Sequence, residues 1–240
     1  MSVIVVENKD EVITRLCKLI ETTAVHSIEE NGTFNIGVSG GSLAPFLTTG
    51  LPNIKTDFSN WRIFFCDERL VPVDSPDSTF GLYKSKLIDS KVVPLKEEQF
   101  ITIKQGVQAE EAAVDYAQKM QKYFPNSILP RFDMLLLGMG PDGHTCSLFP
   151  GHSLLNETSK WVAFLTDSPK PPPSRITLTF PVINNAKMCV FAISGKEKAD
   201  MVKRILVDKE DLPSARVKPT SGDLYWILDR EAGVHVNTKL

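Results

Sequence analysis

One apolar run and the glycine-rich loop after it constrain this chain more than any other feature. Residues 132–137 read Phe-Asp-Met-Leu-Leu-Leu, and Gly138-Met-Gly-Pro-Asp-Gly-His144 follows directly. A short apolar run that ends in glycine is typical of a strand buried on both faces. In parallel α/β sheets, ligands bind beyond the carboxyl ends of the strands. The sequence therefore places Asp142 and His144 where a site is usually found.

Strand-like and helix-like segments alternate along most of the chain. We expect strands at residues 3–6, 34–38, 61–66, 100–103, 132–137, 161–166, 175–180, 188–193 and 224–228, and helices at 9–31, 82–88, 109–124 and 197–207, with a helix beginning near residue 43. This alternation predicts an α/β fold with a largely parallel sheet and helices on both faces. The proline-rich segment 167–174 cannot be regular structure, but the same rhythm continues on both sides of it. We therefore expect one domain over residues 1–240.

Composition excludes several functional classes. The net charge of −2 supplies no basic surface, so we expect no nucleic-acid partner. No apolar segment approaches the roughly 20 residues of a membrane span, and the N-terminal residues lack a signal-peptide pattern. The four cysteines form no CxxC pair, and three fall in apolar segments, as buried thiols of a reducing compartment do. We expect a cytoplasmic protein without a membrane partner.

Two further strand ends carry groups that suit an anion. Ser39-Gly40-Gly41-Ser42 lies between a strand and a helix start, where backbone N–H groups and a serine hydroxyl could cradle a phosphate. A tight turn that needs glycine for its geometry alone explains this motif equally well. Asp67-Glu68-Arg69 ends another strand, and Arg69 could bind a phosphate or a developing oxyanion. Taken alone, a surface ion pair is the more common role of such a cluster.

The Asp142–His144 pair is the strongest catalytic signal. A neutral imidazole can take a proton from water, and a carboxylate two residues away can fix its tautomer. Cys146 follows closely, but no cation or helix start is evident to activate its thiol, so we expect it to be structural. Residues 138–143 match GxGxxG, but Pro141 and Pro150 indicate a loop instead of the helix that a dinucleotide site requires.

Together these segments resemble the 6-phosphogluconolactonase family. The blocks Ile36-Gly-Val-Ser-Gly-Gly-Ser42, Phe65-Cys-Asp-Glu-Arg-Leu-Val-Pro72 and Leu137–Pro150 carry the resemblance, and so do Pro172-Pro-Ser-Arg-Ile-Thr-Leu-Thr179 and Ser194-Gly-Lys-Glu-Lys-Ala199. The resemblance implies a Rossmann-like domain related to glucosamine-6-phosphate deaminase. It also implies hydrolysis of 6-phospho-D-glucono-1,5-lactone to 6-phosphogluconate in the oxidative pentose phosphate pathway, without a cofactor or a metal.

The matching motifs assign roles to individual residues. His144 would be the general base and Asp142 its partner, while Asp67 and Arg69 would border the lactone. The phosphate would be held by Gly40, Gly41, Ser42, Arg175 and Lys196, although an isolated lysine is more often an exposed cation. The expected partner is a small sugar-phosphate lactone, and the expected assembly is a monomer or a weak homo-oligomer.

One segment departs from the family pattern. The family often has Asp-Ser-Asn-Tyr-Gly where this chain has Asp77-Ser-Thr-Phe-Gly81. Thr79 replaces an amide by a hydroxyl and Phe80 has no hydroxyl, so no sugar contact is carried over to either residue. Three other functions stay open at this point: an amino-sugar-phosphate isomerase or deaminase using Asp67, a non-catalytic sugar-phosphate-binding regulator, and, least favoured, a nicotinamide dehydrogenase.

Overall fold

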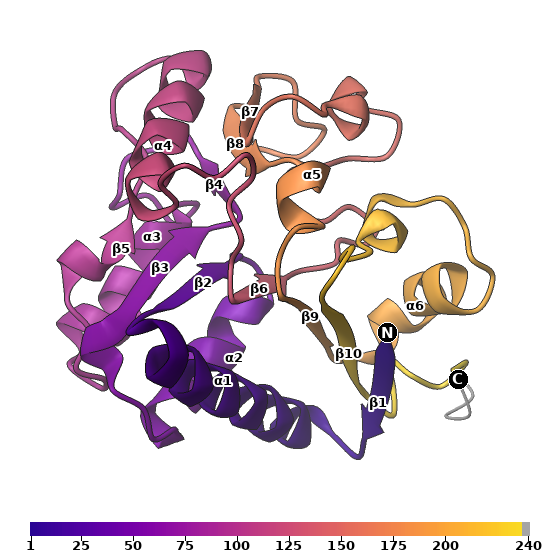
Figure 1. Ribbon diagram of the computed structural model, residues 1–240. Coiled ribbons are helices and arrows are strands. Elements are labelled where there is room, and N and C mark those ends of the chain that lie inside the picture. The colour runs from indigo at the N-terminus through magenta and orange to yellow at the C-terminus, as the bar shows by residue number, and fades with distance from the viewer. Residues whose placement is uncertain (237–240) are drawn as a thin grey trace.

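A seven-stranded parallel sheet forms the centre of the protein (Figure 1). The computed structural model describes residues 1–236, and the strand order is β1-β10-β9-β6-β2-β3-β5. Every neighbouring pair in this sheet runs parallel. The strands are β1 (Ser2–Val6), β2 (Phe34–Val38), β3 (Trp61–Phe65), β5 (Phe100–Ile101), β6 (Met134–Leu137), β9 (Met188–Ile193) and β10 (Asp223–Asp229).

Helices lie on both sides of this sheet, as the alternating pattern predicts. Figure 1 shows α1 and α2 below the sheet and α4 and α5 on the opposite side. The helices are α1 (Lys9–Asn31), α2 (Leu43–Gly50), α3 (Thr79–Tyr83), α4 (Ala109–Tyr123), α5 (Phe180–Ile183) and α6 (Ala199–Leu206), and α3 continues into the π-helical turn η3 (Lys84–Asp89). The α/β fold class is confirmed.

Helix α1 shows how the sequence sets an element. Asn8 accepts a hydrogen bond from the backbone N–H of Glu11 at 3.1 Å, and Gly32 ends the helix in the left-handed conformation with φ 71°. In a full capping box, the Glu11 carboxylate would accept a hydrogen bond from the N–H of Asn8. Here it accepts from the N–H of Glu7, one residue earlier.

A second, antiparallel sheet is the main departure from the sequence prediction. It consists of β4 (Asp67–Arg69), β8 (Arg175–Leu178) and β7 (Val162–Leu165) in the order β4-β8-β7. The alternation over residues 175–180 predicts a half-buried strand, but every residue of β8 is buried. Its polar residues are buried because the loop after β6 covers them: the N–H of Ser147 donates to the hydroxyl of Thr177 at 3.2 Å.

The sheet topology creates a crevice at one edge. Strands β2 and β6 are neighbours, yet the chain continues from β2 to β3 on one side and from β6 to β9 on the other. Such a reversal of direction opens a space beyond the carboxyl ends of the two strands. All four residues of β6 are buried, as predicted.

Among the described residues, no helix is long and apolar enough to cross a membrane.

Candidate active site

A pocket of about 220 Å³ lies in this crevice. Its walls come from the segments that follow β2, β3, β6 and β9, four adjacent strands of the sheet, and from Arg175 at the start of β8. The structure brings most of the predicted site residues together here. The lining residues are Ser39, Gly40, Gly41, Ser42, Asp67, Arg69, Gly138, Met139, Gly140, His144, Cys146, Arg175 and Lys198.

His144 is held by Asp142 at one side of the pocket. Its Nδ1 forms a hydrogen bond with the Asp142 carboxylate, and its ring packs on Phe149 with the centroids 4.7 Å apart. A carboxylate only accepts hydrogen bonds, so Nδ1 carries the proton and Nε2 keeps its lone pair. This arrangement is the base and orienting group of a general-base site.

Lys170 joins this pair, although nothing in the sequence analysis selected it. Its Nζ lies 3.3 Å from Oδ1 of Asp142 and 3.4 Å from Nδ1 of His144. Because Nδ1 already carries a proton, the ammonium group donates to the carboxylate and not to the ring. Lys170 stands between two prolines in the irregular segment 167–174. The two flanking prolines restrict the backbone at Lys170, and they are the feature of the sequence that could have indicated a fixed position for this residue.

The surroundings keep His144 neutral and Asp142 ionised. Burial lowers the pKa of His144 below its ordinary value, the bond to Asp142 opposes this shift, and the charge of Lys170 adds to it. Burial alone would raise the pKa of Asp142, but the interactions with His144 and the charge of Lys170 outweigh it and leave that pKa lowered. A neutral imidazole at pH 7 is the form that can accept a proton.

Gly140 makes this geometry possible. A Cβ atom at position 140 would overlap the His144 ring and would lie 2.8 Å from Oδ1 of Asp142. The backbone at this point also tightens the loop, since the N–H of Gly140 donates to the carbonyl of His144 at 2.8 Å. Only glycine leaves room for the ring against the loop backbone.

The glycine turn after β2 faces the same pocket. Gly41 has φ 62°, and a Cβ atom on Gly40 would meet the hydroxyl of Thr79 at 2.8 Å, so both positions require glycine. The turn leads into the N-terminus of α2, where Ser42 makes no capping bond with its own side chain. The Ser39 hydroxyl is buried and has no hydrogen-bond partner among the described residues. Ser39, Gly40, Gly41 and Ser42 all line the pocket, so the turn forms one of its walls.

Asp67 and Arg69 come from β4, while Glu68 between them has a structural role. The hydroxyl of Ser147 donates to Asp67 at 2.7 Å, and the guanidinium of Arg69 donates to the carbonyl of Asp77 at 3.1 Å. The buried Glu68 carboxylate accepts from the N–H groups of Thr79 and Phe80 at 2.9 and 2.8 Å. Glu68 therefore binds the first N–H groups of α3, and its carboxylate forms no hydrogen bond with the Arg69 guanidinium.

Arg175 mainly holds the Lys170 segment. Its guanidinium donates to the carbonyls of Pro172, Lys170 and Pro171 at 3.0, 2.9 and 3.1 Å. It also lies over the Phe149 ring, 5.6 Å from the centroid, and lines the pocket. Its Nη1 also donates to the Ser147 hydroxyl at 3.5 Å, so every nitrogen of the guanidinium has a partner inside the protein.

Lys198 lines the pocket where the sequence analysis expected Lys196. Both belong to the 3₁₀ turn η6 (Lys196–Lys198), in which three residues complete one turn, so residues two apart point to different sides. Lys196 is exposed and outside the pocket. Lys198 donates to the carbonyl of Met139 at 2.9 Å, and burial lowers its pKa. The pattern Lys-Glu-Lys alone could not distinguish the two.

Burial decides the roles of Thr79, Phe80 and Cys146. Phe80 packs on Phe65 and Phe100 in the core, and Thr79 packs behind Gly40, so neither residue of the departing segment lines the pocket. Cys146 does line it, but contact with Cys66 and burial raise the pKa of its thiol far above the ordinary value. A thiolate nucleophile is disfavoured there, as predicted.

Comparison with known proteins agrees with this geometry. The family model of glucosamine-6-phosphate isomerases/6-phosphogluconolactonase matches residues 7–226. A 6-phosphogluconolactonase of Rattus norvegicus is 46% identical over 235 residues, covering 95% of this chain and 91% of the relative. The Homo sapiens 6-phosphogluconolactonase is 49% identical over 206 residues, or 83% of this chain and 79% of the relative.

A solved structure extends the likeness to three dimensions. The 6-phosphogluconolactonase from Trypanosoma cruzi superposes with a TM-score of 0.85 at 28% identity, covering 98% of this chain and 97% of the other. The match of the family model over nearly the whole chain, the two mammalian relatives and this structure agree with one another. The protein belongs to the glucosamine-6-phosphate isomerase/6-phosphogluconolactonase family.

Proposed function

We propose that this protein is a 6-phosphogluconolactonase, which hydrolyses 6-phospho-D-glucono-1,5-lactone to 6-phospho-D-gluconate. The observation that carries the proposal is His144, held neutral by Asp142 at a pocket that also presents Arg69, Lys198 and the glycine turn. A neutral base beside anion-binding groups suits attack of water on the carbonyl of a phosphorylated lactone. The proposed reaction needs no cofactor.

The phosphate of the substrate binds at the far side of the pocket from His144 in this proposal. The N–H groups of Gly40 and Gly41 and the N-terminus of α2 favour negative charge there. Lys198 replaces Lys196 as the proposed phosphate cation, because only Lys198 lines the pocket. Fixing the phosphate places the carbonyl carbon C1 beside His144, so that remote binding energy orients the reacting atoms.

The chemical step then uses His144 twice. Nε2 takes a proton from water as the hydroxide oxygen bonds to C1 and the carbonyl electrons move onto oxygen. Arg69 stabilises that oxyanion. When the carbonyl re-forms, the bond between C1 and the ring oxygen breaks, and the imidazolium returns its proton to the ring oxygen. Asp142 stays ionised throughout and stabilises the imidazolium.

The direct test is hydrolysis of the lactone generated in situ. The lactone is an ester that hydrolyses unaided, so acid release is followed against a protein-free blank. The proposal requires a rate above that blank. A folded protein that does not accelerate the reaction, or one that releases ammonia from glucosamine 6-phosphate, would contradict it.

Replacing Lys198 by alanine should mainly raise KM for the lactone. One charge-assisted hydrogen bond to the phosphate contributes about 1.5–3 kcal/mol, or roughly 10- to 150-fold in affinity. Lys196→Ala is the matched control, since it removes the same group two residues away on the exposed side. Steady-state kinetics of both variants decide the assignment. An equal rise in KM for both variants, or a larger rise for Lys196→Ala, would reject Lys198 as the phosphate cation.

The pH dependence of kcat/KM should move in opposite directions in two variants. The acid limb reports His144 and should lie below the ordinary histidine pKa, because burial lowers it. Lys170→Met removes a charge that lowers the pKa of His144, so its limb should move to higher pH. Asp142→Asn removes an interaction that raises this pKa, so its limb should move to lower pH, with a smaller maximum. Unmoved profiles would argue against His144 as the titrating base.

A further inference from the structure

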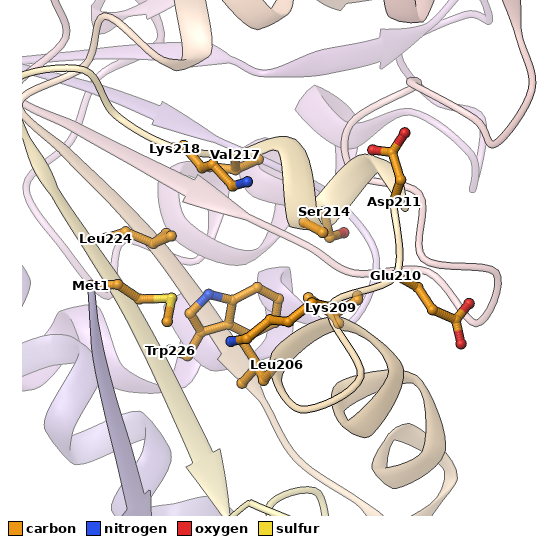
Figure 2. Close-up of a pocket in the computed structure, with 12 residues that line it drawn as sticks. Met1, Leu206, Lys209, Glu210, Asp211, Ser214, Val217, Lys218, Leu224 and Trp226 are labelled. Atoms are coloured by element: carbon orange, nitrogen blue, oxygen red, sulfur yellow. The ribbon is translucent and has the colours of Figure 1, made fainter. Parts of the chain in front are cut away.

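A second cavity, of about 440 Å³, lies away from the active site (Figure 2). It is formed by the C-terminal end of α6, the segment 209–211, the 3₁₀ turn η7 (Pro213–Arg216) and β10. It shares no lining residue with the active-site pocket. Leu206, Val217 and Leu224 give it an apolar interior. Its volume is in the range that small organic ligands occupy in proteins.

The indole of Trp226 supplies an unused donor to this cavity. Trp226 is 1% exposed and stacks on Phe191, with the centroids 4.1 Å apart, so its ring is rigidly placed. Its Nε1 has no hydrogen-bond partner among residues 1–236. Figure 2 shows this nitrogen on the edge of the ring that faces Leu224, Val217 and Lys218. A buried N–H without an acceptor is costly, and an acceptor atom of a ligand would satisfy it.

The other two tryptophans show that this is unusual within the molecule. Nε1 of Trp61 donates to the hydroxyl of Thr56 at 3.2 Å, and Nε1 of Trp161 donates to the carbonyl of Ile128 at 2.8 Å. Trp226 alone of the three tryptophans in the sequence lacks a partner within the described part of the chain.

The rim of the cavity favours an anion. Arg204 binds Glu210 at 2.9 Å and Arg216 binds Asp211 at 2.7 Å, so each of the two carboxylates of the rim is paired with an arginine. Lys209 and Lys218 also line the cavity, and neither forms an ion pair with a carboxylate of residues 1–236. The excess charge at the opening is positive.

We propose that this cavity is a second binding site, which takes a small organic anion with an apolar, preferably aromatic, body. The body fills the space between Leu206, Val217 and Leu224, and an acceptor atom receives the Trp226 N–H. The anionic group lies at the opening near Lys209 and Lys218. This is a different ligand class from the proposed sugar-phosphate substrate, which has hydroxyl groups and no apolar body.

Hydrogen bonds from η7 connect this second cavity to the loop that carries His144. Ser214 lines the cavity and is 1% exposed. Its N–H and its hydroxyl both donate to the carbonyl of Gly143 at 2.9 Å, and the hydroxyl also approaches the carbonyl of His144 at 3.3 Å. A ligand that shifts η7 therefore pulls on the backbone between Asp142 and His144. The bound anion thus acts as an effector of the reaction.

Binding is tested with 2-naphthoate on protein that contains ¹⁵N-labelled tryptophan, with excess 6-phosphogluconate present to occupy the active site. Three indole N–H resonances are expected. That of Trp226 should shift saturably, while those of Trp61 and Trp161 stay in place. The matched neutral compound 2-naphthalenemethanol should bind roughly two- to fivefold more weakly, since the lysines are exposed. An unmoved Trp226 resonance would overturn the site, and equal affinities would overturn its preference for an anion.

Two variants separate the cavity from non-specific binding. Trp226→Phe should lose the assigned resonance and most of the heat of naphthoate binding in calorimetry. Lys218→Glu changes only an exposed side chain and leaves the core intact. It should weaken naphthoate but not the neutral alcohol. Unchanged naphthoate affinity in Lys218→Glu would contradict the charged rim even if Trp226→Phe failed to fold.

The coupling is tested by lactone hydrolysis, and this part rests on the proposed function, whereas the resonance shift does not. Saturating 2-naphthoate should change kcat, because η7 holds the backbone of the loop that carries His144. Ser214→Ala removes the hydroxyl bonds to Gly143 and His144 but keeps the backbone bond, so it should keep the Trp226 shift and weaken the response of kcat to naphthoate. Binding without any change in kcat would overturn the effector role.

Discussion

Replacing His144 by alanine should lower kcat for lactone hydrolysis by roughly 10²–10⁴-fold. The loss follows because no other group at the pocket combines a neutral, proton-accepting nitrogen with a held orientation: Lys170 is an ammonium beside Asp142, and the Cys146 thiol is protonated. KM should change little, since phosphate binding uses other residues. The measurement is steady-state hydrolysis, corrected for the unaided reaction at each substrate concentration.

His26→Ala is the matched control for this loss. His26 is exposed on α1 and forms only a surface ion pair with Glu30 at 3.3 Å, so its removal should leave kcat unchanged. A His144→Ala protein with unchanged kcat and an intact fold by circular dichroism would reject the general-base assignment. A loss that appears in KM alone would make His144 a binding residue instead.

Gly140→Ala should lower kcat by on the order of 10²-fold without unfolding the protein. The added methyl group cannot coexist with the His144 ring in its place, so the ring must move away from Asp142. A displacement of about 1 Å of a catalytic group is enough for a loss of this size. The acid limb of the pH profile should shift as well, because the contact between His144 and Asp142 sets part of the pKa of His144.

Gly138→Ala adds the same methyl group to the same loop. No atom lies within 4 Å of a Cβ at that position, and its backbone has an ordinary φ. We expect His144 to stay in place and kcat to remain within a few-fold, with any effect confined to KM because Gly138 lines the pocket. Similar losses of kcat in both variants would show that loop rigidity, and not room for the imidazole, is what Gly140 provides.

The main sheet could be read from the sequence because its strands are short, apolar and closed by glycine or polar residues. The run Met134–Leu137 is buried on both faces, and that environment leaves an unambiguous pattern. The antiparallel sheet could not be read in this way. Burial of β8 is produced by groups distant in sequence, and the alternation of Arg175-Ile-Thr-Leu178 carries no trace of them.

The same distinction between local and distant interactions applies to the residues of the candidate site. His144 and Asp142 were predictable because one strand end and one loop position them both. Lys170 was not, since it reaches Asp142 across a separation of 28 residues that only the folded chain closes. Arg175 lines the pocket, and phosphate binding by it stays a prediction, but its hydrogen bonds to the carbonyls of the loop that carries Lys170 could not be predicted from the sequence. The partners of long side chains such as lysine and arginine are hard to predict from the sequence, because each side chain can reach several groups.

The pairing of β1 with β10 sets an order of events during translation. Residues 2–6 leave the ribosome long before residues 223–229, which form their neighbour in the sheet. The nascent chain must therefore keep β1 unpaired until β10 has been synthesised. Parallel pairing across such a separation forms slowly, and an unpaired apolar strand is prone to association with other chains. The helix α1 that follows β1 packs partly against β10, so both elements lack part of their covering until β10 has been made, and we expect chaperone protection to matter for them.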